Sequence, residues 1–130
     1  MKKELQDELR KKYKWLEKNM SDKHPYPMFG FEVGDGWYAL LDDLCFEIDR
    51  VFMGTPELEN DFYVAQIKEK FGGLRFYIYG GDNEIDARIS EAEEKSFKIC
   101  EDCGKKGKVN NKGWRVTLCK KCRKVREKNK

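Results

Sequence analysis

The stretch CEDCGKKGKVNNKGWRVTLCKKC, residues 100–122, contains two Cys-x-x-Cys pairs separated by fifteen residues. This spacing is typical of four-cysteine zinc ribbons, in which two tight turns aim four thiolates at one ion and the segment between them returns as a hairpin. Residues 108–109 and 114–118 can pair as the strands of that hairpin. Gly104 permits the positive φ angle that turns backbone N–H groups toward sulfur. We therefore predict one structural Zn²⁺ ion held by Cys100, Cys103, Cys119 and Cys122.

Four protein ligands leave no open position for water, so this zinc is expected to be structural and not catalytic. Two redox-active cysteine pairs or free thiols are the alternative. About thirty residues with few apolar groups cannot supply a core of their own, and the ribbon is expected to need its metal to fold. Cys45 falls within an apolar helical stripe and is expected to be a small buried hydrophobe. His24 is the only histidine, and we expect it to have a surface or packing role.

Upstream of the cysteines, hydrophobic periodicity predicts an α+β fold, with helices packed on a small antiparallel β-sheet. The third predicted helix runs directly into Cys100, so the zinc ribbon is expected to be attached rigidly. We predict an α+β body at 1–99, the ribbon at 100–122 and a basic C-terminal tail at 123–130. Three helices are expected: residues 2–20, Trp37 to Phe52, which Asp35 would cap, and Ile85 to Ile99. Three strands are expected: Phe29 to Val33, Phe62 to Ile67 and Leu74 to Tyr79. A turn at Gly72-Gly73 would join the last two strands.

Charge is segregated along the chain. The net charge is +3, yet residues 21–103 contain eight basic and nineteen acidic side chains, whereas residues 104–130 contain twelve basic and one acidic. A basic end of this kind can bind an external polyanion or fold back on the acidic middle of the same chain. Charge alone leaves both open. Some lysines also offset the negative charge of a four-thiolate zinc site.

Two groups of residues are candidates for ligand binding. Lys70 and Arg75 flank the glycine pair, and Tyr77 follows on the same strand face as Arg75. These three side chains could hold a phosphate or stack a base, or could belong to a plain hairpin with a solvated face. Trp114 and Arg115 on the ribbon hairpin could present an aromatic ring and a cation to a partner, or Trp114 could pack onto the third helix.

Several classes are disfavoured. No segment has the roughly 20 consecutive apolar residues that span a bilayer, and the basic start is not followed by the apolar run of a secretory signal. We expect a soluble protein in the cytoplasm, without a membrane partner. No Walker loop is present, and no nucleophile, base and orienting group are recognisable together.

Three further motifs carry a resemblance. GWYALL at 36–41, QIKEKFGGLRFY at 66–77 and CEDCG at 100–104 resemble a widespread family of small uncharacterised proteins from bacteria, prophages and phages with a C-terminal four-cysteine zinc ribbon. The resemblance spans about residues 34–122. It implies a conditional, mobile-element gene in a bacterial host, with host takeover or counter-defence as its setting. It supplies no catalytic residue.

These observations rank three hypotheses. The first is a non-enzymatic zinc-ribbon protein that contacts nucleic acid or a nucleic-acid-handling protein. The second is a phage or prophage inhibitor of a host defence system, which binds a host protein or sequesters a nucleotide signal. The third is an enzyme acting on nucleotides, for which Arg75, Tyr77 and the acidic residues are the only candidates.

Overall fold

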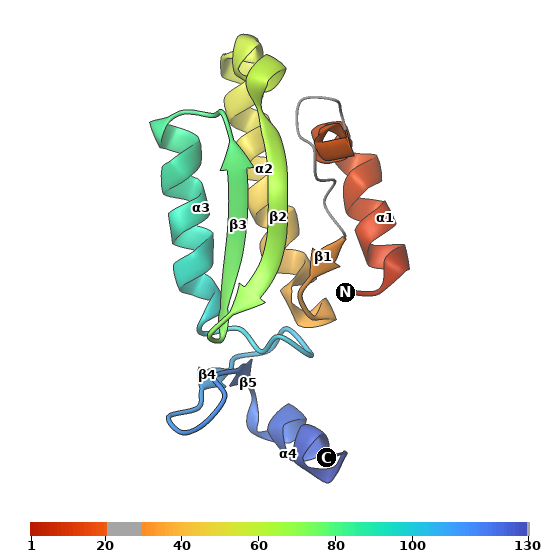
Figure 1. The fold of residues 1–130 in the computed structure, drawn as a ribbon, viewed down its shortest axis with the longest axis vertical. Coiled ribbons are helices and arrows are strands. Elements are labelled where there is room, and N and C mark those ends of the chain that lie inside the picture. The colour runs from red at the N-terminus through yellow and green to blue at the C-terminus, as the bar shows by residue number, and fades with distance from the viewer. Residues whose placement is uncertain (21–29, 130) are drawn as a thin grey trace.

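The computed structural model describes residues 1–20 and 30–129 of the 130-residue chain. His24 and Phe29 therefore lie outside the described residues. Figure 1 shows an α+β body, with the ribbon and the last helix beyond one end of its sheet. The elements in chain order are α1 (Lys3–Lys12), η1 (Lys14–Met20), β1 (Phe31–Glu32), η2 (Asp35–Trp37), α2 (Tyr38–Gly54), η3 (Pro56–Asp61), β2 (Tyr63–Lys70), β3 (Gly73–Tyr79), α3 (Asn83–Ser96), β4 (Lys108–Val109), β5 (Thr117–Leu118) and α4 (Lys120–Lys128).

The body sheet has the strand order β1-β2-β3. The β2–β3 hairpin is antiparallel, and the two-residue β1 adds to β2 in parallel. The predicted α+β fold is confirmed. The prediction of an antiparallel sheet holds for β2 and β3, whereas β1 runs parallel to β2. Parallel strands need a long crossover connection, and the segment that contains α2 supplies it. Figure 1 shows α2 behind the sheet and α3 along the β3 side. None of the described helices is long and apolar enough to span a bilayer.

The core lies between the sheet and α2, α3 and η1. The predicted apolar stripe of α2 is confirmed as buried, from Leu40 to Phe52. An aromatic cluster closes one end of the core, where the ring of Trp15 meets Phe52 at 5.7 Å and Phe62 at 5.4 Å between centroids. Ring contacts of this kind stabilise the fold beyond the contribution of the apolar area that each side chain buries.

The N-terminal helix is shorter than the predicted 2–20, because α1 ends at Lys12 and a 3₁₀ helix follows. The break at Tyr13 lets its hydroxyl donate to the Asp42 carboxylate at 2.8 Å. It also directs Trp15 into the core, where the indole N–H donates to Asp49 at 3.0 Å. The predicted cap at Asp35 is wrong, since this carboxylate accepts the backbone N–H of Lys2 instead.

The hairpin turn differs by one residue from the predicted Gly72-Gly73. Its central residues are Phe71 and Gly72, with φ angles of 54° and 87°, as a type I′ turn requires. Gly73 begins β3, and a Cβ there would lie 2.3 Å from the ring of Phe97. The free edge of β3 is closed by α3, because Ser96 Oγ accepts the N–H of Leu74 and Glu93 accepts that of Phe76. These contacts blunt an edge that would otherwise pair with another chain.

The ribbon is attached to the body by close backbone contacts. Gly36 donates its N–H to the carbonyl of Glu101 at 2.7 Å, and Gly34 donates to the Glu101 carboxylate at 2.9 Å. The buried indole of Trp37 donates to the Ile99 carbonyl at 2.8 Å. On the other side, the hydroxyl of Thr117 donates to the Gly72 carbonyl at 2.5 Å. The ribbon therefore sits on both the start of α2 and the tip of the β2–β3 hairpin.

We predict that Gly36→Ala separates the ribbon from the body and lowers the free energy of unfolding by about 1–3 kcal/mol. An added Cβ would lie 2.2 Å from the Cys100 carbonyl oxygen and 2.6 Å from the Gly104 nitrogen, and backbone atoms on both sides cannot yield. Urea unfolding followed by tryptophan fluorescence measures the change. Gly54→Ala is the matched control, because nothing lies within 4 Å of its Cβ position. Equal stability of the two variants would contradict the prediction.

Candidate metal centre

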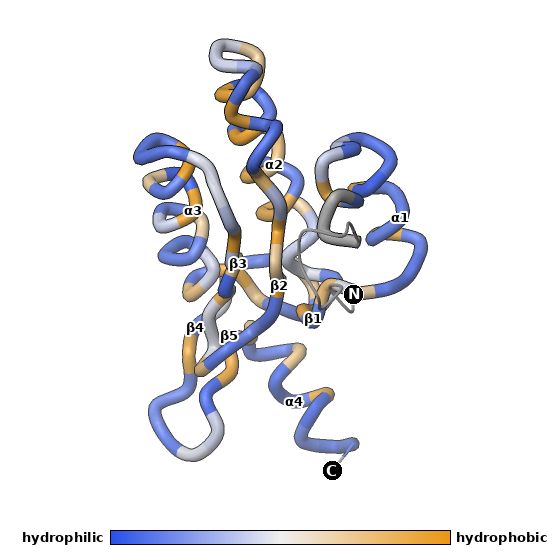
Figure 2. Tube along the Cα trace, turned by 45° about the horizontal axis from the view of Figure 1, so that its top comes forward, coloured by the Kyte–Doolittle hydropathy of each residue, from blue (hydrophilic) through white to orange (hydrophobic). Residues whose placement is uncertain are grey.

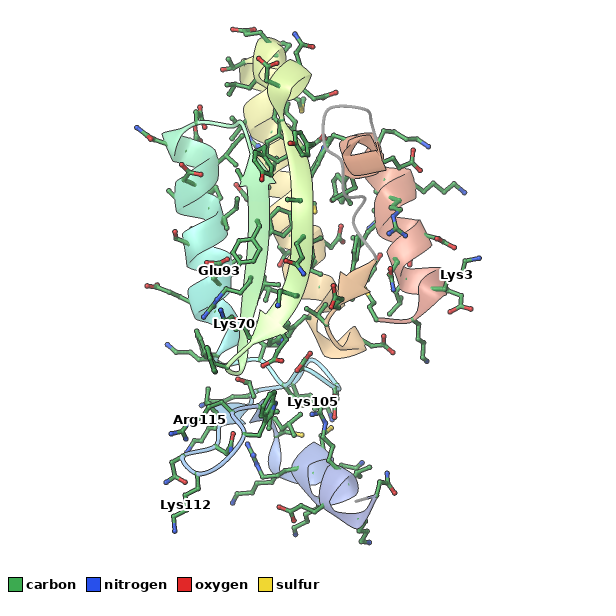
Figure 3. All side chains as sticks on the ribbon, viewed as in Figure 1. Lys3, Lys70, Glu93, Lys105, Lys112 and Arg115 are labelled. Atoms are coloured by element: carbon green, nitrogen blue, oxygen red, sulfur yellow. The ribbon has the colours of Figure 1, made fainter. Side chains whose placement is uncertain are left out.

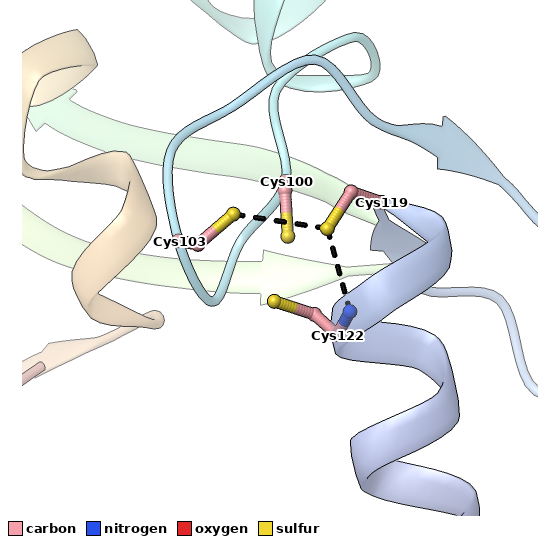
Figure 4. Close-up of side chains that lie close together, drawn as sticks. All are labelled: Cys100, Cys103, Cys119 and Cys122. Carbon is pink, nitrogen blue, oxygen red and sulfur yellow. Dashed lines mark hydrogen bonds between the residues drawn. The ribbon is translucent and has the colours of Figure 1, made fainter.

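The four cysteines of residues 100–122 converge from two separate turns. Cys100 follows α3 beside the bridge between Ile99 and Lys106, and Cys103 lies in the turn after it. Cys119 occupies the N-cap of α4, and Cys122 lies in the first turn of that helix. Figure 4 shows the four sulfur atoms pointing at one common space.

The distances fit one metal ion. All four Sγ atoms lie within 4.8 Å of one another, and those of Cys103 and Cys119 are 3.8 Å apart. Four bonds of about 2.3 Å to one tetrahedral ion separate sulfurs by about 3.8 Å, whereas a disulfide needs about 2.05 Å. The five cysteines of the chain are free. The donor set is therefore a possible four-thiolate metal site.

Local backbone geometry favours a thiolate at Cys119. The N–H of Cys122 donates to the Cys119 sulfur at 3.4 Å, and this hydrogen bond lowers the pKa of Cys119 to about 7. Burial raises the pKa of Cys122, so its ionisation needs a nearby cation. The φ angle of Gly104 is +83°, which confirms the predicted left-handed turn after the first pair. A metal ion would supply the positive charge that the clustered sulfurs require.

Two arginines hold α4 against the ribbon. Arg126 forms a bidentate pair with Asp102, at 2.6 and 2.8 Å, and Arg123 donates to the Lys108 carbonyl at 2.8 Å. Asp102 lies between Cys100 and Cys103. The ion pair between Arg126 and Asp102 therefore joins the turn that carries these two cysteines to α4, whose start carries Cys119 and Cys122. Because α4 continues from Lys120 to Lys128, the predicted boundary between ribbon and tail falls inside one helix.

Cys45 is separate from this cluster. It lies on the buried face of α2 and is 1% exposed, and burial raises the pKa of its thiol. A buried thiol with a raised pKa is a poor nucleophile and a poor ligand. The prediction of a small buried hydrophobe is confirmed.

The hairpin candidates lie on the solvent-facing side of the sheet. Leu74 and Phe76 are buried, whereas Tyr77 on the alternate face is 42% exposed. Arg75 pairs directly with Lys68 across the two strands, so two cations stand side by side, and the guanidinium of Arg75 donates to the Leu74 carbonyl. Lys70 lies next to the turn, with its ammonium 5.6 Å from the Phe71 ring centroid.

The ribbon candidates project from a loop that Asn110 holds. The Asn110 amide donates to the Trp114 carbonyl at 2.8 Å, its side-chain oxygen accepts the N–H of Val116 at 2.7 Å, and its own carbonyl accepts from Arg115 at 2.6 Å. Trp114 is 83% exposed. The alternative that Trp114 packs onto α3 is therefore wrong.

The structure brings together the two candidate groups only in part. A Cβ added to Gly72 at the hairpin tip would lie 3.6 Å from the Val116 backbone, so the tip of the turn that follows Lys70 packs against the ribbon loop, whereas Tyr77 lies farther along β3. Sequence reasoning missed Phe71, which is 68% exposed at this junction. A bulky residue before a glycine pair was the available signal, because such turns favour Asn or Gly.

Comparisons of the chain with protein-family models, with curated proteins and with solved structures gave no match. The interpretation of the site therefore depends on its own geometry.

We predict one metal ion per chain, lost in Cys103→Ser and in Cys119→Ser, because three thiolates hold a closed tetrahedral ion far less tightly than four. Elemental analysis of reduced protein after exhaustive dialysis measures the stoichiometry. Cys45→Ala is the control, and it should keep a full equivalent of metal while losing about 1 kcal/mol of stability to the small cavity. Less than half an equivalent in the parent protein, or loss of metal in Cys45→Ala, would contradict the assignment.

Proposed function

We propose that the four cysteines hold one structural zinc ion, and that the chain is a non-enzymatic protein that binds nucleic acid through the zinc-held ribbon and α4. The observation that carries the proposal is the position of α4. Figure 1 shows this helix beyond the end of the body, attached through the ribbon, and Figure 2 shows it hydrophilic along most of its length.

The position of α4 favours an external polyanion over the acidic middle of the chain. Among the described residues, the only ion pair of α4 joins Arg126 to Asp102. Asp102 belongs by sequence to the acidic stretch 21–103 but lies in the ribbon, so this pair does not bring α4 onto the acidic side chains of the body. An exposed helix whose cations stay solvated remains able to replace the counterions of a phosphate backbone. The lysines of α4 that point to solvent are Lys120, Lys121, Lys124 and Lys128.

Zinc is the ion that this donor set suits best. Four cysteine sulfurs in tetrahedral array select zinc or iron among common metals, and the Cys-x-x-Cys spacing on a hairpin and a helix start is that of structural zinc ribbons. The ion would fix the start of α4 relative to the hairpin, and so orient the basic helix. Parent protein purified with added zinc and iron should retain zinc.

The alternative is an inhibitor of host defence that binds a host protein or sequesters a nucleotide signal. It gains support from the resemblance of motifs such as residues 66–77 to prophage and phage proteins. A nucleotide trap needs an enclosed site, and the hollow of about 820 Å³ beside α2 and α3 is lined by more carboxylates than cations: Asp35, Asp43, Glu47 and Glu91 against Arg88 and Lys95. Arg88 is already paired with Glu47 and Glu91, at 3.9 and 3.6 Å. Those carboxylates repel phosphate. We therefore place nucleic acid first, and a host protein that handles it second.

We predict that the parent protein binds DNA or RNA with an affinity that falls steeply with salt, and that the triple variant Lys121→Ala, Lys124→Ala, Lys128→Ala has a shallower dependence. These three lysines share one face of α4. The slope of log K against log salt should fall by about 0.7 per lost contact for a single strand and about 0.9 for a duplex. Fluorescence anisotropy with labelled oligonucleotides at several salt concentrations measures both slopes.

The matched control removes three exposed lysines from the N-terminal part of the chain, as Lys3→Ala, Lys11→Ala, Lys14→Ala. It changes the net charge by the same amount, so a general charge effect would lower both slopes equally. Circular dichroism and metal content should be unchanged in both variants. Absence of measurable binding near 50 mM salt, where screening is weak, would refute the proposed function.

A further inference from the structure

We infer that the nucleic acid is single-stranded, and that unpaired bases stack on Trp114 and Phe71 where the hairpin tip meets the ribbon. This inference rests on the proposed function and names its substrate class. The two rings and the cations Lys70, Lys112 and Arg115 are called the junction surface. The ligand that we infer for this surface is an unpaired strand of DNA or RNA. Both kinds of strand offer the two features that the surface recognises, which are accessible base faces and phosphates.

Trp114 is the first observation. The indole is 83% exposed, although the loop that carries it is held by several hydrogen bonds to Asn110. Exposed indole in water forfeits the hydrophobic gain of burial. A rigid loop also loses little conformational entropy when a flat partner covers the ring. The loop therefore presents an aromatic platform that is already in place.

Phe71 is the second and independent observation. Its backbone has a φ angle of 54°, and it is the only described residue other than glycine with positive φ. A left-handed conformation costs a non-glycine residue roughly 1–2 kcal/mol, and Asn or Gly would avoid most of that cost in a type I′ turn. The ring gains no burial in return, because it is 68% exposed. An exposed aromatic ring on a strained turn is a feature that folding does not explain and that ligand binding does.

The two rings belong to one junction. Phe71 precedes Gly72, whose added Cβ would lie 3.3 Å from the Thr117 hydroxyl and 3.6 Å from the Val116 backbone. Trp114 lies two residues before Val116 on the same ribbon loop. Figure 3 shows Lys70, Arg115 and Lys112 following one another along the long axis of the molecule, from the hairpin tip to the ribbon loop. Positive charge thus borders both rings, as the phosphates of a strand require.

An unpaired strand fits this surface better than a duplex. Bases within a duplex are stacked on one another and hidden from a protein ring, whereas an unpaired strand can place its bases on aromatic side chains. Stacking is indifferent to sequence, because every base has an aromatic face. The basic ribbon and α4 would then hold the backbone while the two rings hold bases.

The test measures binding of the full-length, zinc-loaded protein to three probes: oligo(dT) and oligo(rU) of about 16 nucleotides, and a duplex of equal length. Trp15 and Trp37 are 3% and 0% exposed, so changes in tryptophan emission on binding report Trp114. We expect both single strands to quench this emission and to bind more tightly than the duplex. Quenching by only one of them would support the inference and identify DNA or RNA as the source.

Variants separate stacking from charge. Trp114→Ala and Phe71→Asn should each weaken oligo(dT) binding by about 5- to 140-fold, the loss expected for one stacked base. Trp114→Phe, which keeps an aromatic ring, should recover most of the affinity, and Trp114→Leu should not. Phe71→Asn should raise the melting temperature, because Asn-Gly suits the turn, so its weaker binding cannot reflect unfolding.

The possible results are distinguishable. Equal affinity for duplex and single strands, or parent affinity in both Trp114→Ala and Phe71→Asn, would overturn the inference. The proposed function would still stand if the α4 triple variant lost affinity in the same assay. Failure of all three probes to bind would overturn both.

Discussion

The close approach of two backbone segments, Gly34–Gly36 of the body and Cys100–Glu101 of the ribbon, is the constraint on which the rest depends. No side chain larger than hydrogen fits at Gly36, and the Glu101 carbonyl accepts the Gly36 N–H there. Cys100, the first residue of the four-cysteine cluster, is thus packed directly on the start of α2. This contact fixes the ribbon to the body. The orientation of the four cysteines therefore also sets the orientation of α4 relative to the sheet.

Glu101 has a central part in that contact. It is 7% exposed, and its carboxylate, carbonyl and N–H bond to Gly34, Gly36 and Thr117. Burial raises the pKa of this carboxyl group, and the N–H of Gly34 partly offsets the effect. The hydroxyl of Thr117 continues the connection to the hairpin tip at Gly72. A single chain of hydrogen bonds therefore runs from the start of α2, through the ribbon, to the turn that carries Phe71.

This arrangement explains where the exposed features of the molecule gather. Acidic side chains of α2 and α3 line a hollow on one side, together with Arg88 and Lys95, and twelve basic residues lie in the ribbon, α4 and the residues that follow, at 104–130. Arg126 and Arg123 are used to hold α4 in place, which leaves the lysines of that helix to solvent. The aromatic rings of the junction surface stand between the sheet and the basic helix. The acidic and basic segments of the sequence therefore lie on different surfaces of the folded protein.

The sequence by itself determined the four-cysteine cluster, the α+β class and the buried stripe of α2. These follow from local spacing: Cys-x-x-Cys pairs, strands of period two and helices of period 3.6. It also located the turn of the β2–β3 hairpin to within a residue, because two short aromatic and β-branched runs flanked a glycine pair, although β2 continues to Lys70 and not to the predicted Ile67. Only the tertiary structure decided that α1 stops at Tyr13, that Asp35 binds Lys2 instead of capping a helix, and that Trp114 stays in solvent. The first two depend on partners far away in the chain, Asp42 for Tyr13 and Lys2 for Asp35, and the third depends on the hydrogen bonds by which Asn110 holds its loop. Periodicity carries no information about which of these groups will meet.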